Sequence, residues 1–161
     1  MPKLTDVERK IWIAFHEFAY KDDFALAEKI IREHPRWAII CSYYAMHDIA
    51  KLYLGKIHNI KISGLEVHRQ TIDELKKVLG QEEEKEKIIK LLEYAESEIK
   101  DIAPDSVPYL LITGKKERGK AQYYYEQSSS KNMDYSQKAL WFIANIAEPF
   151  IKLMEGLINA G

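Results

Sequence analysis

An arginine and three tyrosines near residue 120 are side chains that could take part in chemistry. The stretch KKERGKAQYYYEQ holds Arg118, followed by Tyr123, Tyr124 and Tyr125. A guanidinium binds phosphate or carboxylate through two parallel hydrogen bonds, and tyrosine rings stack on bases or pack at protein interfaces. Successive residues of a helix are about 100° apart, so the three tyrosines cannot share one face. We interpret the stretch as a binding surface or a dimer interface, and the interface is favoured.

Asp48 and Arg118 are charged residues that fall on apolar stripes of predicted helices. Arg118 lies on a stripe of segment 105–127. In segment 36–55, the stripe that includes Asp48 consists of Trp37, Cys41, Tyr44 and Leu52. A charge on a buried face is rare unless it is paired, so Asp48 and Arg118 are predicted partners across a groove between helices. The pair is either a structural salt bridge or an arginine at a pocket mouth that binds phosphate and is steadied by Asp48.

Several familiar chemistries are excluded by the motifs that the sequence lacks. There is no Gly-rich phosphate loop, no Cys-x-x-Cys pair and no HExxH motif. The five histidines never stand three or four residues apart, so no helical pair of metal ligands is present. Cys41 is the only cysteine, which rules out an internal disulfide. We therefore predict no metal, no cofactor and no catalytic residue.

The spacing of apolar residues predicts helices throughout the 161-residue chain. Thr5 is the expected N-cap of a first helix with Ile11, Phe15 and Phe18 on one face, and segment 21–34 is expected to form a second, short helix before Pro35. Pro149 is expected to kink the last helix. The prediction is an all-α, antiparallel up-and-down helical bundle of about five to six helices, with residues 1–161 in a single domain.

Charge and hydropathy limit the surroundings in which we expect the chain. The formal net charge is −1, from 24 basic and 25 acidic side chains, so no overall attraction to nucleic acid is expected. No apolar run approaches the roughly 18 residues of a membrane span, and the start lacks the pattern of a signal peptide. We expect a cytoplasmic protein with no membrane contact.

Three segments, in their order along the chain, resemble the HEPN domain (higher eukaryotes and prokaryotes nucleotide-binding). The run YYAMHDIAKLYL at 43–54 is similar to a third-helix run of that family, VHRQTIDEL follows after a loop, and RGKAQY precedes a final amphipathic helix. Arg118, Ala121 and Tyr123 match an Arg-x-x-Ala-Asp-Tyr pattern, with Gln122 in place of the acid. The similarity covers nearly the whole chain, from about residue 10 to the C-terminus.

The resemblance implies a helical bundle that forms homodimers and acts beside a small nucleotidyltransferase in a toxin–antitoxin pair. The ribonuclease branch of the family carries Arg-x(4–6)-His, with histidine for proton transfer and arginine for phosphate. Counted from Arg118, the histidine positions hold Tyr123, Tyr124 and Tyr125, so this chain resembles the branch without that motif. Tyr125 also stands where a tyrosine of the toxin branch accepts a nucleotidyl group.

Three functions follow as hypotheses. The first is a non-catalytic HEPN-like domain that binds a nucleotide or a nucleotidyltransferase partner through a groove formed by Arg118, Asp48, Tyr123, Tyr125 and Tyr44. The second is a metal-independent endoribonuclease of the toxin type, which would take RNA as its ligand and need an imidazole from His47 or His68. The third is a purely structural dimerisation bundle.

Overall fold

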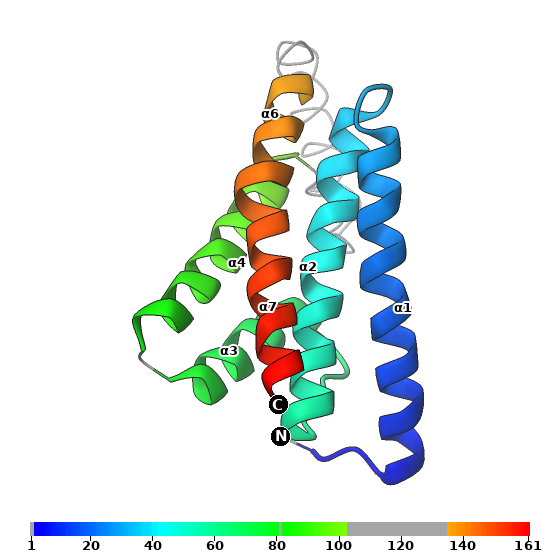
Figure 1. Ribbon diagram of the computed structural model, residues 1–161, viewed down its shortest axis with the longest axis vertical. Coiled ribbons are helices and arrows are strands. Elements are labelled where there is room, and N and C mark those ends of the chain that lie inside the picture. Colours follow the sequence, from blue (N-terminus) through cyan, green and yellow to red (C-terminus); the bar gives the residue numbers. More distant parts are fainter. Residues whose placement is uncertain (1, 81, 103–134) are drawn as a thin grey trace, which may run out of the picture.

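The structure is a computed structural model that describes residues 2–80, 82–102 and 135–161, and its regular secondary structure is helical (Figure 1). The all-α helical bundle expected from the sequence is thus confirmed. The helices are α1 (Asp6–Ile30), α2 (Pro35–His58), α3 (Val67–Leu79), α4 (Glu83–Ile102), α6 (Tyr135–Phe142), η3 (Ile143–Ala147) and α7 (Glu148–Ala160).

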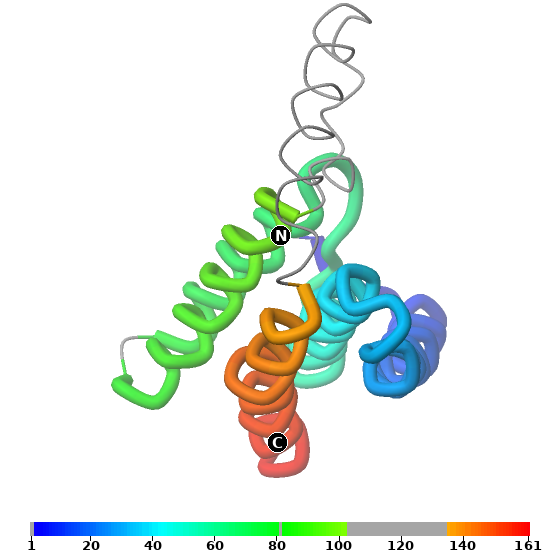
Figure 2. Tube along the Cα trace, turned by 90° about the horizontal axis from the view of Figure 1, so that it is seen from above, coloured from blue at the N-terminus to red at the C-terminus, as the bar shows by residue number. Residues whose placement is uncertain are grey.

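Helix α2 is the central element of the bundle. It packs against α1, α3, α4, α6 and α7, whereas α1 packs almost entirely on α2 (Figures 1 and 2). In Figure 1, α1 runs upward, α2 downward, α4 upward and the α6–α7 run downward, with the short α3 at the lower left. The outer helices therefore surround α2 on several sides, and α1 forms one edge of the molecule.

Helix α1 is a single helix of 25 residues, so the expected separate helix over 21–34 is wrong. The expected cap is confirmed: the backbone N–H of Glu8 donates to the Thr5 hydroxyl, and the Glu8 carboxylate accepts from the Thr5 backbone N–H at 2.8 Å. No proline or glycine interrupts the segment between Asp6 and Ile30, so the helical hydrogen bonds continue through it.

The close packing of α1 on α2 depends on Gly55. An added Cβ at this position would overlap the indole of Trp12. The Nε1–H of the same indole donates to the backbone oxygen of Lys51 at 2.8 Å. The absence of a side chain at Gly55 therefore sets the distance between the lower halves of the two helices.

The outward face of α1 is apolar, contrary to what its position at the edge of the bundle would suggest. Ile11, Phe15 and Phe18, which share one face as the sequence predicts, are each more than 60% exposed. The buried residues of α1 are instead His16, Tyr20 and Ala27, on the opposite side. In α2, Trp37 is also exposed rather than part of a buried stripe; it lies in the first turn of the helix, beside the connection from α1.

The last helical run closes the core opposite α1. Phe142, Phe150 and Met154 are fully buried against the other helices. The irregularity that the sequence places at Pro149 takes the form of a π-helical turn, Ile143–Ala147, directly before it. Proline cannot donate the next helical hydrogen bond, and a wider turn adjusts the helix to that loss.

Candidate functional site

Asp48 is the charged residue of α2 that the sequence predicts to be paired, and it is paired with His16. The Nδ1 of His16 lies 2.8 Å from the Oδ1 of Asp48, and both side chains are largely buried. The antiparallel α1–α2 hairpin brings these two residues together from positions 32 apart in the chain. The predicted partner, Arg118, lies outside the described residues, as do Tyr123 and Tyr125.

A second acidic side chain adjoins this pair. Burial, together with the charge of Asp48 and a hydrogen bond to it, raises the pKa of Asp23 from 3.8 to about 6. Two carboxyl groups in contact cannot both ionise easily, so Asp23 holds its proton into the mildly acidic range. On its other side Asp48 faces the imidazole of His16.

Two histidines stack next to this cluster, one from α2 and one from α3. The rings of His47 and His68 are 4.2 Å apart and nearly parallel. The Nδ1 of His68 lies 2.8 Å from the hydroxyl of Tyr43. Burial raises the pKa of that hydroxyl, which therefore stays neutral in its hydrogen bond with the imidazole.

Both stacked imidazoles are held in the neutral form. Burial is the main cause that lowers the pKa of His68 to about 4, and Lys51 lowers it further. Burial and the neighbouring His68 lower the pKa of His47 as well. His47 is 1% exposed, and neither of its ring nitrogens has a hydrogen-bond partner in the part of the chain that the structure describes. Such a ring favours the neutral state because nothing compensates a buried charge.

Lys51 is a cation that the described residues contribute to this region. Burial lowers its pKa, an effect that Asp48 partly opposes. Among the described residues Lys51 makes no ion pair, since the carboxylate of Asp48 is bound to His16. Tyr44, Asp48, Lys51 and His68 are all partly exposed, and we call these four residues the α2 polar patch.

The α2 polar patch contains two of the predicted site residues, Tyr44 and Asp48, and one that sequence reasoning missed. Within the patch the missed residue is Lys51, and His68 was considered only as a source of imidazole; beside the patch, on α1, sequence reasoning also missed His16 and Asp23. A signal for them exists in the spacing: His16 and Asp23 lie two helical turns apart on α1, and Asp48 and Lys51 lie one turn apart on α2. The spacing within each helix does not show which residues of α1 lie opposite which residues of α2, and that register is what brings the four residues together.

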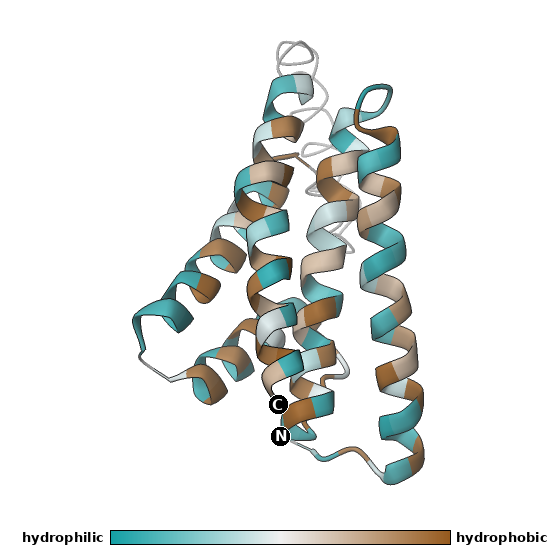
Figure 3. Ribbon diagram, in the orientation of Figure 1, coloured by the Kyte–Doolittle hydropathy of each residue, from teal (hydrophilic) through white to brown (hydrophobic). Residues whose placement is uncertain are grey.

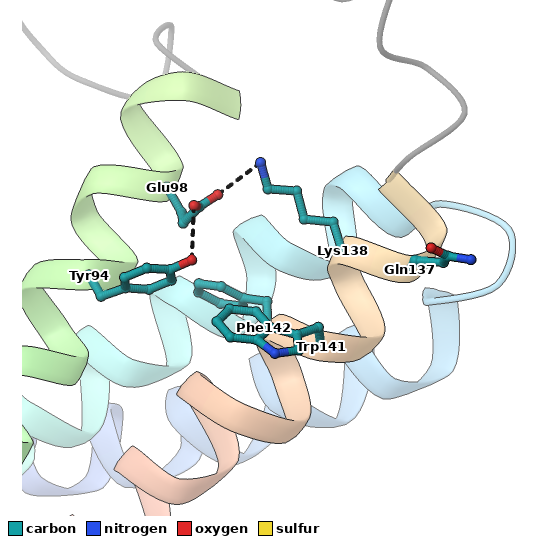
Figure 4. A pocket seen from close by; sticks show the side chains of 6 residues that line it. All are labelled: Tyr94, Glu98, Gln137, Lys138, Trp141 and Phe142. Atoms are coloured by element: carbon teal, nitrogen blue, oxygen red, sulfur yellow. Dashed lines mark hydrogen bonds and ion pairs between the residues drawn. The ribbon is translucent and has the colours of Figure 1, made fainter.

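A separate pocket of about 320 Å³ lies between α4 and α6 (Figure 4). The rings of Tyr94 and Trp141 line it edge to face, 5.7 Å apart. The Glu98 carboxylate accepts from the Tyr94 hydroxyl at 3.1 Å and pairs with Lys138 at 2.9 Å (Figure 4). Because Glu98 already neutralises Lys138, this pocket offers aromatic surface rather than an available charge.

Two classes of site are absent from the described ranges. Within residues 2–80, 82–102 and 135–161 no three His, Cys, Asp or Glu side chains are arranged to hold a metal ion. None of the described helices combines the length and the apolar composition needed to cross a bilayer.

Comparison with protein-family models, curated proteins and solved structures gives no match to this chain. The resemblance to the HEPN domain thus stays a prediction from sequence.

Proposed function

We propose that the chain is a non-catalytic, HEPN-like helical bundle that binds a nucleotide, or a nucleotidyltransferase partner that carries one, at the α2 polar patch. The observation that supports this function is Lys51: its side chain is only partly exposed, burial lowers its pKa although the nearby Asp48 opposes this, and it makes no ion pair among the described residues. A buried cation is costly unless a counter-ion joins it, so a phosphate group would be stabilised there.

The neighbours of Lys51 suit the remaining parts of a nucleotide. Tyr44 and His68 are partly exposed rings, 6.0 Å apart and perpendicular, and a base can stack on either one. Arg118, Tyr123 and Tyr125 belong to the same proposal as additional ligand contacts, on the sequence argument alone. The homodimer and the toxin–antitoxin role implied by the family resemblance are part of this proposal.

Binding is favoured over RNA cleavage because the imidazoles are poorly matched to proton transfer. A general acid or base works best when its pKa lies near the working pH. The pKa of His68 is lowered to about 4, and that of His47 is also lowered by burial, so neither imidazole is a ready proton donor near pH 7. The ribonuclease hypothesis therefore has less support in this patch than the binding hypothesis.

Titration of the purified protein with ATP in a calorimeter tests the proposal. We expect saturable binding, and we expect Lys51→Met to weaken it about 10- to 100-fold because a partly buried contact to phosphate is lost. Lys56→Met is the matched control, since Lys56 is a partly exposed lysine of the same helix. No saturable binding, or equal binding by both variants, would contradict the proposal.

A second assay separates the competing hypotheses. The same preparation is incubated with RNA in the absence of metal, beside Arg118→Ala. We expect no cleavage by either protein. Cleavage that is lost in Arg118→Ala would support the ribonuclease instead, and would show that an imidazole serves in spite of its lowered pKa.

A further inference from the structure

Helix α1 has two apolar faces, and only one of them contacts the other described helices. The outward face carries Val7, Ile11, Ala14, Phe15 and Phe18, which we call the α1 stripe. Its four large side chains are each between 61% and 69% exposed. A helix that is apolar on both sides normally has neighbours on both sides. The stripe is therefore an apolar surface with no partner among the described helices, and a second molecule could cover it.

The position of α1 leaves the stripe accessible along its whole length. Because α1 packs almost entirely on α2, its far side faces away from the bundle (Figures 1 and 2). Figure 3 shows hydrophobic segments along α1, including its lower half, where the stripe begins. A second helix can thus approach the stripe without displacing any of the described helices.

The size of the stripe suits a pairing between two copies. Its large side chains expose about 500 Å² of apolar surface, which is near the upper end for a single patch on a monomer. Two copies facing each other would remove on the order of 1,000 Å² from water, and that area is about the minimum for a specific interface. One copy alone exposes a surface that is unfavourable in water.

The spacing of the stripe is that of a coiled-coil seam, and its flanking charges select the direction of pairing. Val7, Ile11, Ala14 and Phe18 follow each other at intervals of four, three and four. In an antiparallel pair, Val7 packs against Phe18 of the second copy, and Ile11 against Ala14.

The charges beside this seam are complementary only in the antiparallel direction. Lys10 and Glu17 are exposed and lie seven residues apart on one flank of the stripe. Antiparallel pairing brings Lys10 of each copy beside Glu17 of the other, which gives two ion pairs. Parallel pairing would place Lys10 beside Phe15, without an ion pair. Charges that flank a seam set the orientation of coiled coils.

We propose that the α1 stripe is a homodimer interface in which two α1 helices pair antiparallel across a two-fold axis. This inference rests on the homodimer of the proposed function and adds the surface, the direction and the contacts. A two-fold axis needs one self-complementary patch, and the stripe with its Lys10 and Glu17 flank is self-complementary. The α2 polar patch does not contain any stripe residue, so the two sites can be tested separately.

Light scattering on the protein as it elutes from a size-exclusion column, loaded at about 50 µM, tests the interface. We expect a mass of twice the 18.8 kDa of one chain. Ile11→Glu and Phe18→Glu place a charge in the seam and should raise the dimer dissociation constant at least about 100-fold. Leu65→Glu is the control, because Leu65 is also highly exposed but lies outside α1. Circular dichroism checks that each variant is folded.

Charge reversal tests the antiparallel contacts. Lys10→Glu and Glu17→Lys each turn two ion pairs into two repulsions and should weaken the dimer by about 5- to 30-fold. The double variant Lys10→Glu/Glu17→Lys restores opposite charges and should recover the wild-type affinity. If the double variant instead loses as much dimer affinity as the two single variants together, this register is ruled out.

The outcomes distinguish this inference from the rest of the proposed function. A monomeric wild-type protein would overturn both the interface and the homodimer, while ATP binding at the α2 polar patch is decided by Lys51→Met. A dimer that persists in Ile11→Glu and in Phe18→Glu would overturn the α1 interface and leave a homodimer that forms elsewhere.

Discussion

Asp48 lies between an imidazole and a second carboxyl group, and its charge is one cause of the raised pKa of that carboxyl group, Asp23. The Nδ1 of His16 is 2.8 Å from the Oδ1 of Asp48. The pKa of Asp23, on the other side, is raised to about 6. Burial of Asp23 is the larger cause of that raised pKa, and Asp48 is the next. The two causes differ in kind, because a substitution at Asp48 removes one and leaves the other.

Replacing Asp48 by asparagine should lower the pKa of Asp23 without returning it to 3.8. The negative charge of Asp48 is lost, but the burial of Asp23 remains. The measurement is a titration of the Asp23 carboxyl carbon by NMR in wild type and in Asp48→Asn. Asp22→Asn is the control, since Asp22 is the smallest cause of the raised pKa. An Asp23 pKa that stays near 6 in Asp48→Asn would show that burial alone explains it.

At the scale of elements, the α1–α2 hairpin depends on one close approach. The Trp12 indole occupies the space above Gly55 and donates to the backbone oxygen of Lys51. The same hairpin brings His16 to Asp48, so the packing of the two helices and the geometry of the site have a common origin.

Gly55→Ala should therefore destabilise the protein by about 2 kcal/mol, in spite of the higher helix propensity of alanine. The new methyl group forces Trp12 away and strains its hydrogen bond to Lys51. Gly156→Ala is the matched control: Gly156 lies inside α7 with open space around it, so alanine should stabilise by up to about 1 kcal/mol. Urea unfolding measures the free energy of unfolding of both variants. Equal effects of the two substitutions would contradict the close approach at Gly55.

The elements also show what the sequence predicts well and what it does not. The Thr5 cap and the helices are readable because capping and periodicity are local. The side of α1 that faces the core is not readable, since Ile11, Phe15 and Phe18 form a better apolar face than the face that contains His16 and Tyr20. Burial of that weaker face follows from tertiary packing on α2, and periodicity alone carries no information about it.

The site was partly predictable for the same reason. A charged residue on a stripe of α2 needs a partner, and Asp48 has one. The identity of the partner depends on the register between α1 and α2, which no spacing within either helix specifies. Likewise, His47 and His68 stack only because α3 turns back onto α2 after the loop.

For the molecule as a whole, the stacked histidines make stability depend on pH. In the native state, the pKa of His68 is about 4 and that of His47 is also lowered, whereas the unfolded values lie near 6.5. Between about pH 6.5 and 4 the unfolded chain therefore binds more protons, and stability falls as the pH falls. Asp23 acts in the opposite direction between 3.8 and about 6, but it is more exposed than the stacked pair. The net expectation is a loss of stability in acid.

His68→Gln tests this expectation, because glutamine can accept from the Tyr43 hydroxyl but does not titrate. His68 alone should account for about 3 kcal/mol of the stability that wild type loses between pH 7.5 and 4, since folding lowers its pKa from 6.5 to about 4. Urea unfolding at both pH values should show a correspondingly smaller loss in His68→Gln. His34→Gln is the control, because His34 is exposed and should leave the loss unchanged. A His68→Gln protein that loses as much stability as wild type would mean that His68 is not held neutral by the fold, and the argument against proton transfer at the α2 polar patch would then lose its basis.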